Sequence, residues 1–231
     1  MLSTPKNREI DHRTLKLLVG LMALSLPFFT SLLAKNPITS ISASYYEGGW
    51  SQSIFIGFLF AISAFLLAYN GKSTPEMVLS KVAAGASFGV ALFPCDCEGH
   101  VPPVPYVHGV SAAIMFLILA CFCYIFLQRA RRKNYRQAQR RAIIYILCGI
   151  TIVVSVLALG IDIFAGGIFS AIVARFTLYA EAAVLIAFGI SWLTASRLIP
   201  FITTKEERDE YFDPKAVQDV PDGKSASTAS V

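Results

Sequence analysis

The sequence has few charged residues and very few histidines. Only 15% of its 231 residues are Asp, Glu, Lys or Arg, and only three are His. Soluble domains carry about 25% charged residues, so a water-facing globule is excluded, as is a disordered chain. Five cysteines are too few for a disulfide-rich secreted scaffold. No phosphate-binding loop, nucleotide-binding motif or catalytic-triad order is present. What the sequence has instead is apolar length, since 55% of it is hydrophobic.

Six apolar stretches approach the roughly 20 residues that an α-helix needs to cross a bilayer. They run over residues 14–34, 53–69, 75–94, 107–128, 142–164 and 171–196. The predicted fold class is therefore all-α, a polytopic membrane bundle of six transmembrane helices. Residues 14–196 form its transmembrane domain, residues 1–13 an N-terminal segment, and residues 197–231 a largely disordered acidic tail.

Glu76 belongs to the sequence Ser73-Thr74-Pro75-Glu76, which is typical of the start of a helix. We expect its carboxylate to complement the dipole of the third predicted span.

The basic residues are segregated along the chain. They gather on the N-terminal flank (Lys6, Arg8, Arg13 and Lys16), after the fourth span and in the tail, whereas the first, third and fifth connections hold only Lys35. Basic residues favour the cytoplasmic side of a membrane. We therefore expect both termini to be cytoplasmic, in a plasma membrane or a bacterial inner membrane.

The connection after the fourth span is rich in arginine. Its basic residues are Arg129, Arg131, Arg132, Lys133, Arg136, Arg140 and Arg141. Each basic residue near a membrane surface attracts anionic lipid headgroups by about 1 kcal/mol. The lipid bilayer and its anionic headgroups are therefore the predicted partners of this segment, and nucleic acid is not. The sequence identifies no protein partner.

Ionisable residues inside membrane helices are costly and are candidates for function. Four of those in the predicted spans are the candidates: Lys81, Asp162, Arg175 and Glu181. Lys81 and Glu181 are expected at similar depths, so they form a pair, or Lys81 extends to the cytoplasmic surface. In the second case Glu181 is protonated or bonded to hydroxyls such as those of Ser87 or Thr151. Asp162 and Arg175 flank a Gly-Gly turn, where a salt bridge is the simplest interpretation.

The outer connections contain the other candidate residues. Cys95, Cys97, His100 and His108 offer thiols and imidazoles that suit a soft or borderline metal. The alternatives are a thiol or disulfide role for the two cysteines, or an ordinary loop. Ser42, Tyr45 and Tyr46 lie in the first outer connection, where a polar cavity could form.

Several short motifs occur in a characteristic order. They are SISASYY at 40–46, GFLFAI at 57–62, AYNG at 68–71, GVALFP at 89–94 and EAAVLIAFGISWL at 181–193. In this order the chain, from about residue 20 to residue 195, resembles an uncharacterised family of multi-pass membrane proteins, one of the domains of unknown function. The resemblance implies a six-helix integral membrane protein and carries no activity with it.

The expected function is that of a non-enzymatic bundle which binds or transports a lipid or small molecule through an outward-facing polar site, without a cofactor. The alternative is a metal-dependent lipid hydrolase that uses the segment from Cys95 to His108. A third possibility, an ion or proton pathway centred on Glu181, needs a chain of polar groups, and the second and fourth spans offer few.

Overall fold

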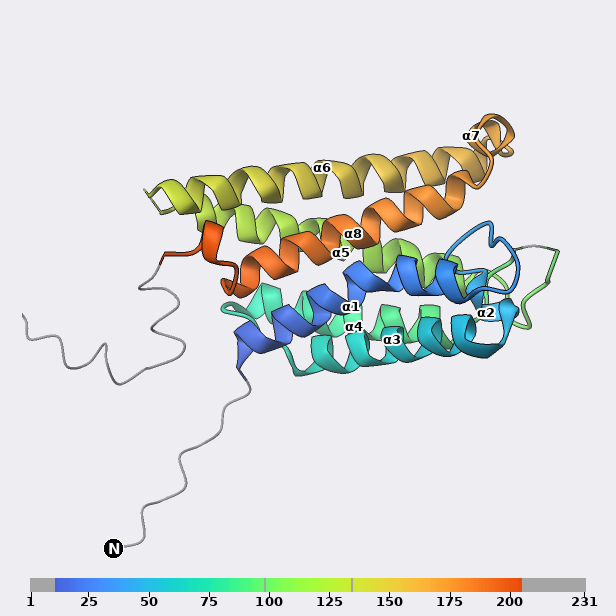
Figure 1. Ribbon diagram of the computed structural model, residues 1–231, viewed down its shortest axis with the longest axis horizontal. Helices are drawn as coiled ribbons and strands as arrows, with labels where there is room; N and C mark the ends of the chain where they lie inside the picture. The colour runs from blue at the N-terminus through green and yellow to red at the C-terminus, as the bar shows by residue number, and fades with distance from the viewer. Residues whose placement is uncertain (1–10, 98, 134, 205–231) are drawn as a thin grey trace, which may run out of the picture.

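The computed structural model describes residues 11–97, 99–133 and 135–204. In these ranges the chain is helical and has no strand. The long helices lie side by side (Figure 1), and the described ranges contain six of them. They are α1 (His12–Leu33), α3 (Gly49–Ala68), α4 (Thr74–Leu92), α5 (Val107–Arg131), α6 (Arg136–Phe164) and α8 (Phe176–Ser196). The short elements are α2 (Ser44–Glu47), α7 (Ile168–Ile172) and η1 (Pro200–Ile202).

The long helices form a closed ring in which successive members alternate in direction (Figure 1). Starting from α1, the order of packing is α3, α4, α5, α6 and α8, and α8 returns to α1. The start of α1 and the end of α8 therefore lie at the same end of the bundle, called here the basic end. The opposite end, where α2 and α7 lie, is called here the Glu181 end.

Two glycines let α1 and α8 approach each other closely. A Cβ atom built on Gly20 would lie 3.0 Å from the carbonyl oxygen of Gly189, and one built on Gly189 would lie 2.8 Å from that of Gly20. Small residues at such crossings are typical of membrane helices, because their association depends on close packing rather than on water exclusion. The crossing fixes the ends of α1 and α8, which carry residues of both polar clusters described below.

The outer surface of the bundle is apolar. On α6, the exposed residues recur at intervals of three and four and so form one stripe along the helix; they are Ile143, Leu147, Ile150, Val154, Leu157 and Ile161. By length and composition, α1, α3, α5, α6 and α8 can cross a membrane. The remaining long helix, α4, is richer in Ala, Gly and Ser, and it lies in the ring between α3 and α5.

The helix boundaries correct two predictions. First, α6 begins at Arg136 rather than at residue 142, so part of the predicted arginine-rich connection is helical. Second, the predicted segment 171–196 contains a break, because Arg175 has a left-handed backbone with a φ of 62° and precedes α8. Arg175 therefore lies outside the transmembrane helix. The predicted acidic tail is described only as far as residue 204, and its remainder is outside the described residues.

Candidate functional site

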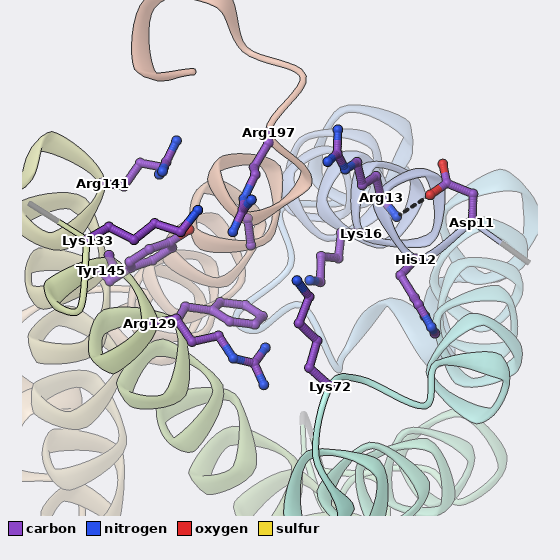
Figure 2. Close-up of a pocket in the computed structure, with 13 residues that line it drawn as sticks. Asp11, His12, Arg13, Lys16, Lys72, Arg129, Lys133, Arg141, Tyr145 and Arg197 are labelled. Carbon is purple, nitrogen blue, oxygen red and sulfur yellow. Dashed lines mark hydrogen bonds between the residues drawn. The ribbon is translucent and has the colours of Figure 1, made fainter. Parts of the chain in front are cut away.

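A cavity of about 410 Å³ opens at the basic end, among the ends of α1, α5, α6 and α8 and the connection from α3 to α4. We call it the basic pocket (Figure 2). Its lining residues are Asp11, His12, Arg13, Lys16, Lys72, Phe126, Arg129, Ala130, Lys133, Arg141, Tyr145, Ala195 and Arg197. Seven of these residues are basic and one, Asp11, is acidic.

Asp11, the acidic residue of the pocket, caps α1. Its carboxylate accepts hydrogen bonds from the backbone N–H groups of Arg13 (2.9 Å) and Thr14 (3.1 Å) and from the Thr14 hydroxyl (2.7 Å). These donors are the unpaired amides of a helix N-terminus, which an aspartate satisfies well.

Glu76, directly behind the pocket, is fully buried and neutralises Arg129. The two terminal guanidinium nitrogens of Arg129 donate to the Glu76 carboxylate, and the bond from Nη1 measures 3.0 Å. The Tyr69 hydroxyl also donates to this carboxylate, as does the Lys72 backbone N–H, at a distance of 2.8 Å. A carboxylate offers about four acceptor positions, so this set of donors saturates Glu76. Burial, followed by the contact with Glu76, raises the pKa of Tyr69, which therefore stays a neutral donor.

Lys16 is nine-tenths buried and faces the pocket. Its ammonium lies 5.2 Å from the ring centre of Tyr69 and 5.1 Å from that of Phe126, which are cation–π contacts. Among the described residues it has no hydrogen bond or ion pair. A buried cation is costly without an anionic partner, and the nearby carboxylate of Glu76 is already saturated.

Lys72 and Arg197 add positive charge around Lys16. Figure 2 shows Lys16 and Lys72 pointing toward one another from α1 and from the connection between α3 and α4. Partial burial, and then the guanidinium groups of Arg197 and Arg129, lower the pKa of Lys72. Arg197 caps α8 with a left-handed φ of 60°, a conformation that costs a residue other than glycine about 1 kcal/mol. Such strain at a pocket is a reason to suspect function.

The pocket therefore gathers basic side chains within the part of the chain that the structure describes. Of its seven basic residues, Arg129 pairs with Glu76, whereas Lys16 and Lys72 have no anionic partner among the described residues. A concave site with several cations and few carboxylates is suited to an anion.

The Glu181 end contains a second polar cluster, formed by Glu181, Ser42 and His108. One carboxylate oxygen of Glu181 accepts the backbone N–H groups of Ile41 (2.6 Å) and Ser42 (3.3 Å). The other lies 3.0 Å from the Ser42 hydroxyl, which in turn lies 3.0 Å from Nε2 of His108. We call these three side chains the Glu181 cluster.

The hydrogen bonds fix the number of protons in this cluster. Nδ1 of His108 lies 2.7 Å from the carbonyl oxygen of Phe93, which can only accept, so Nδ1 carries a proton. The Ser42 hydroxyl has one proton and donates either to His108 or to Glu181. In the first case Glu181 is protonated and His108 neutral; in the second Glu181 is ionised and His108 is an imidazolium. The two arrangements contain the same number of protons, and in both the net charge of the three side chains is zero.

The Glu181 cluster has the residue types of a hydrolase triad but not its connections. In a triad the carboxylate orients the histidine, which activates the serine. Here Glu181 contacts the serine instead, and the backbone amides that could polarise a substrate carbonyl donate to Glu181. The cluster therefore holds the segment 34–43 onto α8.

Two further contacts hold the same segment. The Arg175 side chain donates to the carbonyl oxygen of Ile38 (2.7 Å), and the Leu178 backbone N–H donates to that of Thr39 (3.1 Å). The predicted Asp162–Arg175 salt bridge is therefore wrong. Asp162 instead accepts the backbone N–H groups of Phe169 (2.6 Å) and Ser170 (3.0 Å), together with the Ser170 hydroxyl.

The predicted pair of Lys81 and Glu181 does not form either. The Lys81 ammonium donates to Asn70 Oδ1 (2.9 Å) and to the carbonyl oxygens of Leu67 and Tyr69, at the basic end. The alternative interpretation, in which Glu181 bonds to a hydroxyl, is closer to the structure. The hydroxyl is that of Ser42, however, and not that of Ser87, which donates to the carbonyl oxygen of Leu59.

The residues of the predicted metal site are not gathered as a set. Cys95 and Cys97 form a disulfide with each other, which leaves neither sulfur as a thiolate ligand. His100 stacks on the ring of Tyr46, with ring centres 4.0 Å apart, while His108 belongs to the Glu181 cluster. In the described ranges no three His, Cys, Asp or Glu side chains are placed to hold a metal ion.

The two predicted tyrosines lie on α2 and contact neighbouring segments. The Tyr46 hydroxyl donates to the carbonyl oxygen of Cys95 (2.9 Å). The ring of Tyr45 packs edge-on against Tyr46, and its backbone carbonyl accepts from the Gln52 amide (2.6 Å).

The arginine-rich segment divides into two groups. Arg129 and Arg141 turn inward, since Arg129 pairs with Glu76 and Arg141 donates to the Ile202 carbonyl (2.8 Å) and the Tyr135 hydroxyl (2.7 Å). Four other arginines are exposed at the basic end: Arg131, Arg132, Arg136 and Arg140. The sequence does not distinguish these two groups, and it gives Lys16, Tyr69 and Glu76 no role in a site. Two sequence features point to the site: Lys16 lies near the start of an apolar span, and Glu76 is an acidic residue expected on the same side of the membrane as the arginine-rich segment.

The ring of long helices and its apolar exterior define a polytopic helical membrane protein. Residues 17–191 match the family described as a protein of unknown function (DUF998), and the chain belongs to this family. Neither the curated proteins nor the solved structures include a significant match.

Proposed function

We propose that this protein is a non-enzymatic membrane protein that binds an anionic ligand in the basic pocket. The observation that carries the proposal is the buried side chain of Lys16, which faces a cavity lined by basic residues while the nearby carboxylate of Glu76 is saturated by other donors. An anion in the pocket would supply the counter-charge that the buried Lys16 lacks, and the exposed Lys72 would add a second charged contact to it.

This proposal changes the expected location of the site. The sequence predicts an outward-facing polar site near Glu181, but the Glu181 cluster is neutral and its polar groups bond to one another. The alternative of a metal-dependent hydrolase has less support, because its two cysteines are joined in a disulfide. In the basic pocket, Lys16 and Lys72 have no anionic partner among the described residues, and the pocket is therefore the better candidate for a ligand site.

We also propose six membrane crossings, with both termini in the cytoplasm. The alternation of the six long helices supports the even number (Figure 1). The gathering of basic side chains at the end that holds the start of α1 and the end of α8 supports the orientation. Protease digestion of tags at the two termini in sealed, right-side-out vesicles should leave both intact; cleavage of either tag would contradict the proposal.

Anion binding can be tested by thermal unfolding of the full chain in detergent. Replacing chloride by phosphate at constant ionic strength should raise the unfolding temperature, because a ligand that binds only the folded protein stabilises it. The double variant Lys16→Met/Lys72→Gln should lose this response. The matched variant Arg131→Gln/Arg132→Gln, which removes two exposed charges, should keep it. Equal responses of all three proteins would reject the basic pocket as an anion site.

A further inference from the structure

We infer that the anion is the phosphomonoester headgroup of a membrane lipid, held between Lys16 and Lys72. This inference rests on the proposed anion-binding function and names the chemical class of its ligand. The reasons are the depth of the pocket relative to the apolar surface, the number of charges without an anionic partner, and the size of the cavity.

The depth of the pocket matches the level of lipid headgroups. On α6, Arg141 lines the pocket, and two residues further along the helix Ile143 is 58% exposed. On α1, Lys16 lines the pocket, and Leu18 and Leu21 are exposed. With a rise of about 1.5 Å per residue, the lipid-facing surface begins within a turn of these cations. A headgroup phosphate of a bilayer around the apolar surface would therefore lie at the height of the pocket.

The charge of the pocket selects the kind of phosphate. Lys16 and Lys72 point toward one another (Figure 2), and neither ammonium has an anionic partner among the described residues. A phosphomonoester carries a charge of about −1.5 to −2 at neutral pH, which matches two ammonium groups. A phosphodiester headgroup offers only a single negative charge to the same pair.

The surroundings hold Lys16 in place for such a ligand. The rings of Tyr69 and Phe126 contact the Lys16 ammonium, and Glu76 is already engaged by Arg129 in a two-pronged ion pair. The cavity of about 410 Å³ is in the range of small-molecule sites, about 300–1,000 Å³. It therefore has room for a phosphate together with the glycerol or sugar that carries it.

The test compares three probes on the full chain in mixed micelles, with lipid binding measured by native mass spectrometry. The probes are dioleoyl phosphatidate, dioleoyl phosphatidylglycerol and soluble glycerol 3-phosphate. Phosphatidate should bind one to one and about tenfold more tightly than phosphatidylglycerol, because a second charge-assisted contact is worth at least that factor. It should also bind more tightly than glycerol 3-phosphate, because the lipid is anchored beside the pocket.

Variants assign the preference to the pocket. Lys72→Gln, at an exposed position, and Lys16→Met should each reduce the ratio of phosphatidate to phosphatidylglycerol affinity toward one. Arg131→Gln/Arg132→Gln should weaken both lipids by the same factor and leave the ratio unchanged. If Lys16→Met does not fold, Lys72→Gln alone decides, since that side chain is exposed.

The possible failures are distinguishable. If glycerol 3-phosphate binds as tightly as phosphatidate, and Lys72→Gln weakens both, the pocket binds anions but the lipid source is wrong. If the two lipids bind equally and only Arg131→Gln/Arg132→Gln weakens them, the attraction belongs to the exposed surface and the inference is overturned. If none of the three probes binds, the proposed anion-binding function fails as well.

Discussion

The two ends of the bundle contain polar clusters that balance their charges differently. At the Glu181 end, Glu181, Asp162 and Arg175 each bond to backbone groups, and the Glu181 cluster is neutral because it shares one proton. At the basic end, Glu76 balances one cation, while Lys16 and Lys72 have no anionic partner in the described ranges. Both ends contain buried ionisable residues, so the presence of charge alone does not identify a ligand site. What distinguishes the basic end is charge that the protein leaves unbalanced.

Removing the ion pair at the basic end should have the largest effect on stability. Glu76→Ala leaves Arg129, the Tyr69 hydroxyl and the Lys72 amide without their acceptor, so the free energy of unfolding should fall by about 3 kcal/mol. Denaturant titration in detergent measures this loss. Asp96→Asn is the control, because Asp96 is an exposed carboxylate. A loss no larger than that of the control would mean that Glu76 does not stabilise the basic end.

Truncating Glu181 should have the next largest effect. Glu181→Ala removes the acceptor of two backbone amides and the partner of Ser42, and should cost about 2 kcal/mol. Glu181→Gln should cost less than about 1 kcal/mol, because an amide can donate to Ser42 as a protonated carboxyl does. The same unfolding titrations apply. Equal losses in the two variants would show that the cluster needs an ionised carboxylate and would contradict the neutral arrangement with a protonated Glu181.

Neutralising Lys16 should increase the free energy of unfolding, in contrast to the two losses above. Lys16→Met removes an ammonium that lacks an anionic partner and keeps an apolar chain against Tyr69 and Phe126. In lipid-free detergent and chloride buffer the variant should be more stable than the parent by about 1 kcal/mol. Added phosphate should reduce or reverse this difference, since only the parent binds the anion at full strength. A clear destabilisation in the absence of phosphate would remove the contrast between the two ends.

The smallest loss of stability is expected for variants of Asp162 and Arg175. Each bonds to backbone or hydroxyl groups, so Asp162→Asn and Arg175→Met should lower the unfolding temperature independently. The shift of the double variant should equal the sum of the single shifts. A double variant that loses clearly less than this sum would indicate the direct salt bridge that the sequence predicts and the structure does not contain.

Much of the fold could be predicted because apolar length is a local property. The start of α5 and the ends of α6 and α8 lie at residues 107, 164 and 196, as expected, and the ends of the other spans lie close to their predictions. The start of α6 was missed because arginines at 136, 140 and 141 resemble a connection, although a helix can extend beyond the membrane with its basic side chains in water. The break before α8 was missed because Val173 and Ala174 continue the apolar run.

The sites were less predictable, because partners distant in the sequence decide them. Ser42, His108 and Glu181 were each singled out, but the contact between Ser42 and Glu181 joins positions 139 residues apart. Lys81 and Glu181 were matched by depth, and depth does not say which helices are neighbours: α4 packs against α3 and α5, not against α8. Glu76 was expected only to complement a helix dipole, because the proximity of Arg129 arises from the packing of α4 against α5.

The sequence by itself determined the class of the protein, the approximate helices and the segregation of its cations. These follow from hydrophobic length and from the cost of placing charge in a bilayer, both of which depend on residues close together in the chain. The tertiary structure decided which charges are balanced. The closed ring of helices brings Arg129 to Glu76 and Ser42 to Glu181, and it leaves Lys16 facing a cavity without a counter-charge among the described residues. A hydrogen bond or ion pair requires atoms within a few ångströms, and only the packing of the helices sets those distances.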